Sequence, residues 1–506
     1  MRIVKIGYLL GYDIGSSSIK AALLDPETGK PVASATSPKT ELEIHAPKPG
    51  WAEQDPGVWW QHVMSATAEL AESGKVDLRD VEAIGISYQM HGLVIVDKDY
   101  KVLRPSIIWC DSRAVEIGER AFADIGKDIC LGSMLNSPGN FTASKLKWVK
   151  ENEPDIYRRT YKAMLPGDYI AMMLTGDIKT TASGLSEGIL WDFKKQNVAD
   201  EVLDYFGISM DIIPDVVPTF APQGSVTKGA AKELGLKPGT PVAYRAGDQP
   251  NNALSLNVLN PGEVAATAGT SGVIYCVNDK ADYDIKSRVN IFAHVSYKPD
   301  APRYGVLMCI NGTGILNRWL KHRILSTSKD ITYEEMNDFA SRAPVGSSDL
   351  VFLPYGNGAE RTLCNVDIGA SLHGLNFNIH DRAHVLRAAQ EGIVFALNYG
   401  FGIMREMGIE VKTIRAGHAN MFLSPLFGEA FANTVGVAVE LYNTDGAQGA
   451  ARGAGIGTGI FHGYADAFTG LERIRVIEPE DVLMRAYEAA YEKWLAVLDS
   501  RLREVQ

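Results

Sequence analysis

The segment Asp13–Lys20, which reads Asp-Ile-Gly-Ser-Ser-Ser-Ile-Lys, has the composition of a phosphate-binding turn. In a Gly/Ser turn, successive backbone N–H groups can point into one concavity, and the Lys20 ammonium adds a further donor for phosphate oxygens. The Asp13 carboxylate is placed to hold a hydrated Mg²⁺ ion. The same residues also suit an ordinary surface hairpin, so this turn alone leaves both interpretations open. The predicted phosphate contacts are Gly15, Ser16, Ser17, Ser18 and Lys20.

A second turn of this kind, Gly269-Thr270-Ser271-Gly272, lies in the second half of the chain between two apolar runs. The two similar hairpins form a weak internal repeat and indicate a duplicated domain. Two such turns on opposite sides of a cleft could clamp the phosphate tail of a nucleotide. The chain has neither the Walker pattern nor a G-x-G-x-x-G after its first strand, which argues against a P-loop enzyme or a dinucleotide-dependent dehydrogenase.

The segment Arg245–Asn252 places a carboxylate at the end of a predicted strand. The apolar run Pro241–Tyr244 leads into Gly247-Asp248, and a helix-like stretch follows. A carboxylate in this position near a domain junction can accept a proton from a substrate hydroxyl, as an aspartate does in kinases. An aspartate that only caps the helix is equally common, so Asp248 alone does not decide between these roles.

Polar residues also follow two other predicted strands, in Gln89–Gly92 and in Ile108–Arg113. Such groups can hydrogen-bond a polyol, and an indole such as that of Trp109 can cover its carbon face. The alternatives are structural, with His91 satisfied in the core and Asp111 in a local ion pair.

The loop Gly417–Asn420 joins a predicted strand to a helix. It could receive the flat face of adenine, with Asn420 at the edge of the ring. An ordinary connection between strand and helix has the same spacing, and the sequence does not separate the two.

The predicted elements alternate between strands and helices after an initial hairpin, which is typical of an α/β protein with mixed sheets. A helix is expected to begin at Asp55-Pro56, because a capping aspartate followed by proline is a helix-start signal. We place the boundary between two domains near Ala253–Asn260, which divides the chain into residues 1–254 and 255–506. The other expected elements are strands at Ile3–Gly11, Ile19–Leu24, Val81–Ser87 and Val411–Arg415, and helices at Asp55–Glu72, at Asp381–Met407 and from Asp445.

Bulk properties limit the classes of protein to which the chain can belong. A length of 506 residues favours two or three domains. The net charge of −11 argues against a broad nucleic-acid surface, and no apolar run reaches the roughly 18 residues of a membrane span. The five cysteines are scattered without a C-x-x-C pair, as free thiols in a reducing cytoplasm would be. We therefore expect a cytoplasmic protein without a nucleic-acid or membrane partner.

Taken together, these segments resemble the FGGY carbohydrate kinase family from about Gly7 to Gly463. The resemblance implies an actin-like ATPase fold, with two ribonuclease-H-like domains around a central cleft. It also implies ATP and Mg²⁺ as cofactors, Asp248 as the catalytic base, and Asp13 with Asp248 at the metal. Further segments similar to the family's signatures are Phe141–Trp148, Phe352–Tyr355, Gly358–Thr362 and Leu372–Leu375.

Within the family, Met90-His91-Gly92 is similar to the sugar motif of members that phosphorylate D-xylulose, whereas members that act on glycerol have Arg-Glu there. Gly50–Pro56 and the pattern Trp109-x-Asp111-x-Arg113 point the same way. The implied sugar contacts are Met90, His91, Trp109, Asp111, Asp248 and Gln249. The implied nucleotide contacts are those of the first turn with Gly269, Thr270, Ser271, Gly314, Gly417 and Asn420.

Two segments depart from the family pattern. Gln249-Pro250-Asn251 follows Asp248 where asparagine and small residues are usual, and Ala416-Gly417-His418 replaces a glycine-rich adenosine loop. A kinase for ribulose, gluconate, glycerol or a deoxyketose therefore stays an alternative, as does a non-catalytic actin- or chaperone-like ATPase. A homodimer is left open.

Overall fold

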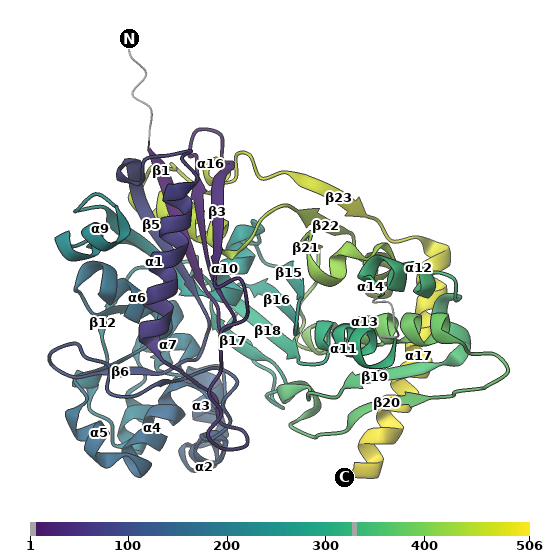
Figure 1. Ribbon diagram of the computed structural model, residues 1–506. Helices are drawn as coiled ribbons and strands as arrows, with labels where there is room; N and C mark the ends of the chain where they lie inside the picture. Colours follow the sequence, from purple (N-terminus) through teal and green to yellow (C-terminus); the bar gives the residue numbers. More distant parts are fainter. Residues whose placement is uncertain (1–6, 326–330, 506) are drawn as a thin grey trace.

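The computed structural model describes residues 7–325 and 331–505. Two α/β bodies lie next to each other, the first built mostly from the purple and blue part of the chain and the second from the teal to yellow part (Figure 1). Each body contains one large mixed sheet. Of the predicted first strand, the residues before Gly7 lie outside the described residues.

The first sheet has six strands in the order β13-β14-β5-β1-β2-β3. β1 pairs antiparallel with β2, and Ile14 lies opposite Ile19, so the Gly/Ser turn closes a hairpin as predicted. β1 and β14 both run parallel to β5, and their carboxyl ends therefore lie at one edge of the sheet. The strands are β1 Tyr8–Ile14, β2 Ile19–Leu24, β3 Pro31–Ser37, β5 Val81–Tyr88, β13 Phe220–Ser225 and β14 Pro241–Gly247.

Helices cover both faces of this sheet. α1 (Pro56–Glu72) and α6 (Pro166–Thr175) pack on one face. α1 begins as predicted, because the Asp55 carboxylate accepts a hydrogen bond of 2.8 Å from Gly57 N and proline occupies the first helical position.

The other face is covered by α15 (Gly446–Thr458), which comes from the second half of the sequence. The helix lies so close that a Cβ on Gly11 would be 1.8 Å from Ala447 O and one on Gly85 would be 1.9 Å from Ala450 O. Only glycine fits at these two strand positions. The division at residues 254/255 stays a prediction, but the first sheet is completed by a helix from beyond it.

The second sheet has seven strands in the order β17-β18-β16-β15-β21-β22-β23. β15 and β16 form the predicted second hairpin, and Ala268 lies opposite Gly272. The strand expected at Val411–Arg415 begins two residues later, because its pairing with β15 starts at Thr413. The strands are β15 Glu263–Ala268, β16 Gly272–Asn278, β17 Asn290–Ala293, β18 Tyr304–Ile310, β21 Thr413–Gly417, β22 Val439–Tyr442 and β23 Arg473–Ile477.

Long helices pack against the second sheet and against one another. α13 (Arg382–Glu406) contacts β16 and β18, in agreement with the helix predicted there. α14 (Pro425–Val435) contacts β22 and β23, and α17 (Asp481–Val505) packs on both helices. No helix within the described residues is long and apolar enough to cross a membrane.

Smaller elements extend both bodies. Those of the first body are β4 Glu53–Gln54, β6 Val94–Val96, β7 Ser106–Ile107, α2 Val115–Ile125, α3 Lys127–Ser133, α4 Thr142–Asn152, α5 Pro154–Arg159, β8 Lys162–Met164, β9 Lys179–Thr181, α7 Ala182–Glu187, β10 Trp191–Asp192, β11 Asn197–Val198, α8 Asp200–Phe206, β12 Asp215–Val217, α9 Lys228–Leu234 and α10 Asp248–Ser255. Those of the second body are α11 Gly314–Trp319, α12 Tyr333–Ala340, β19 Val351–Tyr355 and β20 Gly369–His373, whereas α16 Tyr464–Ala467 packs with α15 on the first body (Figure 1).

Two short helices connect the bodies. α10 follows β14 directly, and Asn251 Nδ2 donates to Gly446 O over 2.9 Å while Asn252 Nδ2 donates to Thr267 Oγ1 over 3.0 Å. α7 lies along β17, where Ser183 Oγ donates to Ala293 O and Ala293 N donates to Ser186 Oγ, both over 2.9 Å. The candidate active site lies around these two helices.

Candidate active site

Asp248 is the first residue of α10, at the end of β14 and at the junction between the two bodies. Its side chain is partly exposed. Burial and, less strongly, the nearby Asp13 carboxylate raise the pKa of the carboxyl to about 7, although hydrogen bonds from Gln249 oppose the rise. A carboxyl group with this pKa can both take up and release a proton near neutral pH, as a general base must.

Asp13 lies near the end of β1, close to Asp248. Ser87 Oγ donates a hydrogen bond of 2.7 Å to Asp13 Oδ1, and Lys20 is its cross-strand partner. Burial raises the pKa of Asp13, while Lys20 and Ser87 lower it. A Cβ on Gly446 would lie 2.5 Å from Asp13 Oδ2, so the first turn of α15 lies directly over the carboxylate.

These two carboxylates fit a Mg²⁺ ion. Both are oxygen ligands, which this cation prefers, and their mutual repulsion would be relieved by a divalent cation between them. Within the described residues, no group of three His, Cys, Asp or Glu side chains could hold a metal ion. The other ligands would then be water and phosphate oxygens, as is usual for Mg²⁺.

The first Gly/Ser turn is held by its neighbours. Gly15 N donates to Ser18 O over 3.1 Å, and Gln54 Nε2 donates to Ser16 O over 2.7 Å. Trp109 Nε1 lies 3.3 Å from Ser16 Oγ, and the Trp109 side chain is 36% exposed. A predicted sugar contact therefore touches a predicted phosphate contact.

The structure also brings together the predicted nucleotide residues of the second body. Gly314 N donates to Gly269 O over 2.8 Å, and a Cβ on Gly269 would lie 3.5 Å from Asn420 Nδ2. Thr270 and Asn420 are exposed. Ser271 Oγ donates to Asn311 over 3.4 Å, and Gly417 ends β21. Their contacts with a nucleotide stay a prediction.

Met90 and His91 follow β5, and Met90 lies against the segment that carries Asp248. Met90 is buried, and a Cβ on Gly247 would be 2.5 Å from its Cγ. His91 has a φ of 62°, and its main-chain oxygen accepts a hydrogen bond of 3.0 Å from Lys145 Nζ. Its ring centroid lies 4.7 Å from that of Phe141 and 5.3 Å from that of Phe292, which belongs to the second body.

The His91 ring has a defined hydrogen-bonding state. Burial and the nearby Lys145 lower its pKa to about 3, so the ring is neutral at working pH. Nδ1 lies 2.9 Å from Glu187 O and must carry the hydrogen, because a carbonyl oxygen only accepts. Nε2 is then an acceptor, which suits a sugar hydroxyl.

Asp111 is part of a buried network of ion pairs. Asp111 Oδ2 accepts hydrogen bonds from Ala52 N at 2.6 Å and from Arg113 Nη2 at 2.7 Å. Arg113 also pairs with Glu53 at 2.7 Å, and its guanidinium lies 3.8 Å from the centre of the Trp51 ring. Both Asp111 oxygens are occupied in this network. A direct contact between Asp111 and the sugar stays a prediction.

Gln249 is partly exposed and donates to the Asp248 carboxylate. Its Oε1 has no hydrogen-bond partner among the described residues. The amide thus donates to the base, and its oxygen is a buried acceptor without a partner among the described residues.

The sequence did not identify three residues that the structure adds to this site. Ser87 binds Asp13, Asp445 begins the helix that covers it, and Glu187 lies behind Gly247. Ser87 and Asp445 lie in segments whose strand and helix were predicted, but their contacts are made across the sheet. Glu187 follows no motif, and a carboxylate at the end of a short helix gave no signal.

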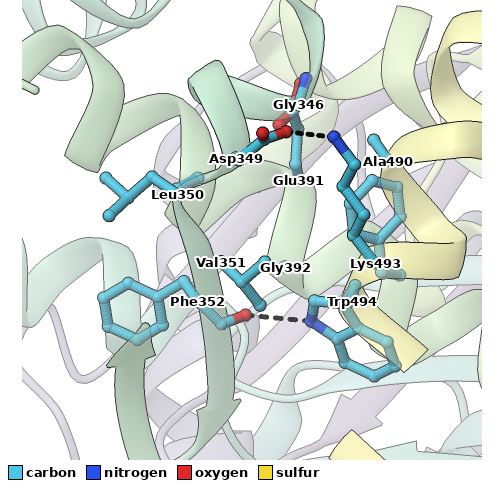
Figure 2. A pocket seen from close by; sticks show the side chains of 12 residues that line it. Gly346, Asp349, Leu350, Val351, Phe352, Glu391, Gly392, Ala490, Lys493 and Trp494 are labelled. Carbon is cyan, nitrogen blue, oxygen red and sulfur yellow. Dashed lines mark hydrogen bonds and ion pairs between the residues drawn. The ribbon is translucent and has the colours of Figure 1, made fainter. Parts of the chain in front are cut away.

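A small cavity in the second body lies outside this site (Figure 2). It is lined by the middle of α17 and by residues of β19 and α13. Lys493 pairs with Asp349 at its rim, and Trp494 Nε1 donates to Phe352 O over 3.0 Å. None of the predicted site residues lines it.

Comparisons with known proteins identify the family of the chain. Residues 8–255 match the N-terminal domain of the FGGY family of carbohydrate kinases, and residues 264–459 match its C-terminal domain. The chain is 32% identical over 462 residues to the xylulose kinase of Bacillus subtilis, covering 90% of this chain and 89% of that protein. It is 29% identical to the L-xylulose/3-keto-L-gulonate kinase of Escherichia coli, covering 96% of each.

The solved xylulose kinase of Rhodospirillum rubrum superimposes with a TM-score of 0.85 at 25% identity, covering 97% of this chain and 98% of that one. The chain therefore belongs to the FGGY family of carbohydrate kinases. Its two mixed sheets form the actin-like ATPase fold of that family, and it is an ATP-dependent carbohydrate kinase, as predicted.

Proposed function

We propose that the enzyme phosphorylates D-xylulose to D-xylulose 5-phosphate in pentose catabolism, with Asp248 as general base and MgATP as phosphoryl donor. The observation that carries the proposal is the position of Asp248. Its carboxyl group, with a pKa of about 7, interacts with the Asp13 carboxylate, and the preceding residue Gly247 lies against Met90 of the sugar motif. Curated relatives similar over most of the chain are named xylulose kinases, which supports the choice of sugar.

The first body contributes the groups that orient the sugar. The neutral His91 ring accepts a hydroxyl hydrogen at Nε2, Met90 provides an apolar wall beside Gly247, and Gln249 Oε1 accepts a second hydroxyl. Trp109 and Asp111 complete the predicted set of sugar contacts. Orientation of this kind supplies a large part of the rate acceleration in phosphoryl transfer, because little other covalent chemistry is needed.

In the reaction, Asp248 takes the proton of the terminal hydroxyl of the sugar. The hydroxyl oxygen forms a bond with the γ-phosphorus of ATP, and the bond from that phosphorus to the bridging oxygen of ADP breaks. Asp13, with Asp248 beside it, would hold a Mg²⁺ ion, which would supply positive charge to neutralise the phosphates. The backbone amides of the two turns and Lys20 bind the phosphate oxygens, and the loop at Gly417 and Asn420 receives the adenine.

The test is a panel of acceptors in a coupled assay of ADP release. We expect D-xylulose to give the highest kcat/KM, above L-xylulose, ribulose, gluconate and glycerol. A higher kcat/KM for another acceptor would overturn the choice of sugar but not the kinase. Slow release of ADP that no sugar increases would favour the ATPase alternative.

The cellular location and the oligomeric state of the enzyme remain expectations. Five free cysteines, of which Cys110 and Cys364 are exposed, fit the reducing cytoplasm in which ATP is available. Light scattering of the purified enzyme would show whether it forms a homodimer.

A further inference from the structure

A buried carboxyl group, that of Glu187, lies directly behind the proposed base. Glu187 is the last residue of α7, and its side chain is 1% exposed. A Cβ on Gly247 would lie 2.5 Å from Glu187 Oε2. The absence of a side chain at Gly247 therefore gives this carboxyl group room beside the residue that precedes Asp248.

Glu187 also contacts His91 of the Met90–His91 sugar motif. Glu187 O is the acceptor for His91 Nδ1 at 2.9 Å, and this contact fixes which nitrogen of the neutral ring faces away from α7. Met90 Cγ and Glu187 Oε2 approach Gly247 from the same side, since both lie 2.5 Å from the position of its Cβ. Glu187 therefore contacts the proposed sugar-binding residues and the segment of the base.

No cation pairs with Glu187 among the described residues, and its Oε1 has no hydrogen-bond partner there. The charged groups that act on it most strongly are two carboxylates, Asp248 on α10 and Asp168 on α6. The Tyr88 hydroxyl of β5 and the Tyr275 hydroxyl of β16 lie nearby, and Tyr275 is 3.1 Å from His294 Nδ1.

Arg245, the cation near these acids, already has other hydrogen-bond partners. Arg245 donates to Asp168 at 3.2 Å, to Gln223 at 2.8 Å and to Lys179 O at 3.0 Å. An ionised Glu187 would be a buried negative charge next to two other acids, which is strongly unfavourable. A protonated carboxyl group avoids this penalty and remains a hydrogen-bond donor.

We propose that Glu187 is a positioning residue, an uncharged carboxylic acid that packs behind Gly247 and fixes both the direction of Asp248 and the orientation of the His91 ring. This inference rests on the proposed function, because it takes Asp248 as the base and His91 as a sugar contact. The α7 helix that carries Glu187 is itself anchored to β17 by Ser183 and Ser186. The position of the acid is therefore set by contacts with both bodies.

The experiment compares the full-length enzyme with Glu187→Gln and Glu187→Ala. Glutamine keeps the shape and the donor of a protonated carboxyl group, so kcat and KM should change by less than about threefold. The inflection of the kcat/KM pH profile should move by less than about 0.3 pH units, because no charge is removed. Alanine leaves the Gly247 segment and Asp248 without support, and kcat should fall at least about tenfold.

Two results would overturn the proposal. A fall of about one pH unit or more in the inflection for Glu187→Gln would show that a negative charge had been removed from beside Asp248. Wild-type kcat in a folded Glu187→Ala would show that Asp248 needs no such support. If the alanine variant does not fold, the inflection for Glu187→Gln decides on its own.

Two further variants complete the design. Glu391→Gln is the matched control, because Glu391 is also buried but pairs with Arg387 at 2.7 Å in the second body. It should lower the melting temperature and leave the pH profile unchanged.

Asp248→Asn separates the proposal for Glu187 from the proposed function. Normal turnover in this variant refutes the proposed base, whereas a loss there together with wild-type kcat in Glu187→Ala refutes only the role of Glu187.

Discussion

The first body contains two groups of acids that differ in their partners. Asp111 and Glu53 are both paired with Arg113, and each of these ion pairs is 2.7 Å long. Asp248 and Asp13 repel each other at the edge of the same sheet, and burial is the largest cause of the raised pKa of each. The residue types are the same, so the partner decides the role. Paired acids hold the fold together, and acids without a sufficient cation are ready to take a proton or a metal ion.

The largest expected effect comes from removing the base. Asp248→Asn should lower kcat by about 10²- to 10⁴-fold, the range for a positioned general base, while the protein remains folded. The measurement is steady-state ADP release with the best acceptor of the panel. The exposed Asp99→Asn is the control and should keep wild-type turnover. A loss of less than about tenfold in Asp248→Asn would place the base elsewhere.

Breaking the paired group should lower the stability of the fold. Arg113→Ala leaves Asp111 and Glu53 buried without this cation, and we expect a loss of about 3–5 kcal/mol in the free energy of unfolding. Urea denaturation followed by circular dichroism measures it. Arg79→Ala, which removes an exposed ion pair with Asp77, should leave the midpoint unchanged. Equal urea midpoints for Arg113→Ala and Arg79→Ala would contradict the proposed difference between the paired and the unpaired acids.

The pH dependence of stability sharpens the same comparison. The pKa of Asp248 is about 7 in the native protein and near 4 when unfolded, so the native state keeps a proton that the unfolded state has lost. Its stabilising contribution is complete below pH 4 and is lost as the pH rises through 7. At 1.36 kcal/mol per pKa unit, the loss is up to about 4 kcal/mol.

Asp248→Asn removes this dependence. Without metal ions, the variant should match the wild type near pH 4.5 and become more stable above pH 7. Melting temperatures in EDTA across this range measure the difference. A difference that does not grow with pH would show that Asp248 is ionised in the native protein at all these pH values.

Local signals in the sequence were sufficient for the hairpins and for α1. The turn at Gly15 lies between two apolar runs, and Asp55-Pro56 marks a helix start whatever the rest of the chain does. The order of the motifs along the chain also identified the family correctly. These features depend on neighbours in the sequence or on resemblance, so they could be read before the fold was known.

The remaining features depend on contacts between distant segments. Arg113 reaches Glu53 from another part of the chain, and Glu187 comes to Gly247 only when α7 and β14 pack together. A glycine in a predicted strand, such as Gly11, does not indicate which helix will pack against it. Spacing along the chain carries no information on these pairs, because they are set by how the helices pack on the sheets.

The position of α15 has a consequence for how the protein is made. Its residues 446–458 cover the strands that include Leu9 and Ala83, so these strands leave the ribosome long before their covering helix does. Until synthesis passes residue 458, one side of the earliest β-structure lacks its apolar partner, and a nascent chain stalled before that point should depend on chaperones. A gene split between the two family domains should likewise yield an N-terminal product that aggregates unless the remainder is supplied alongside it.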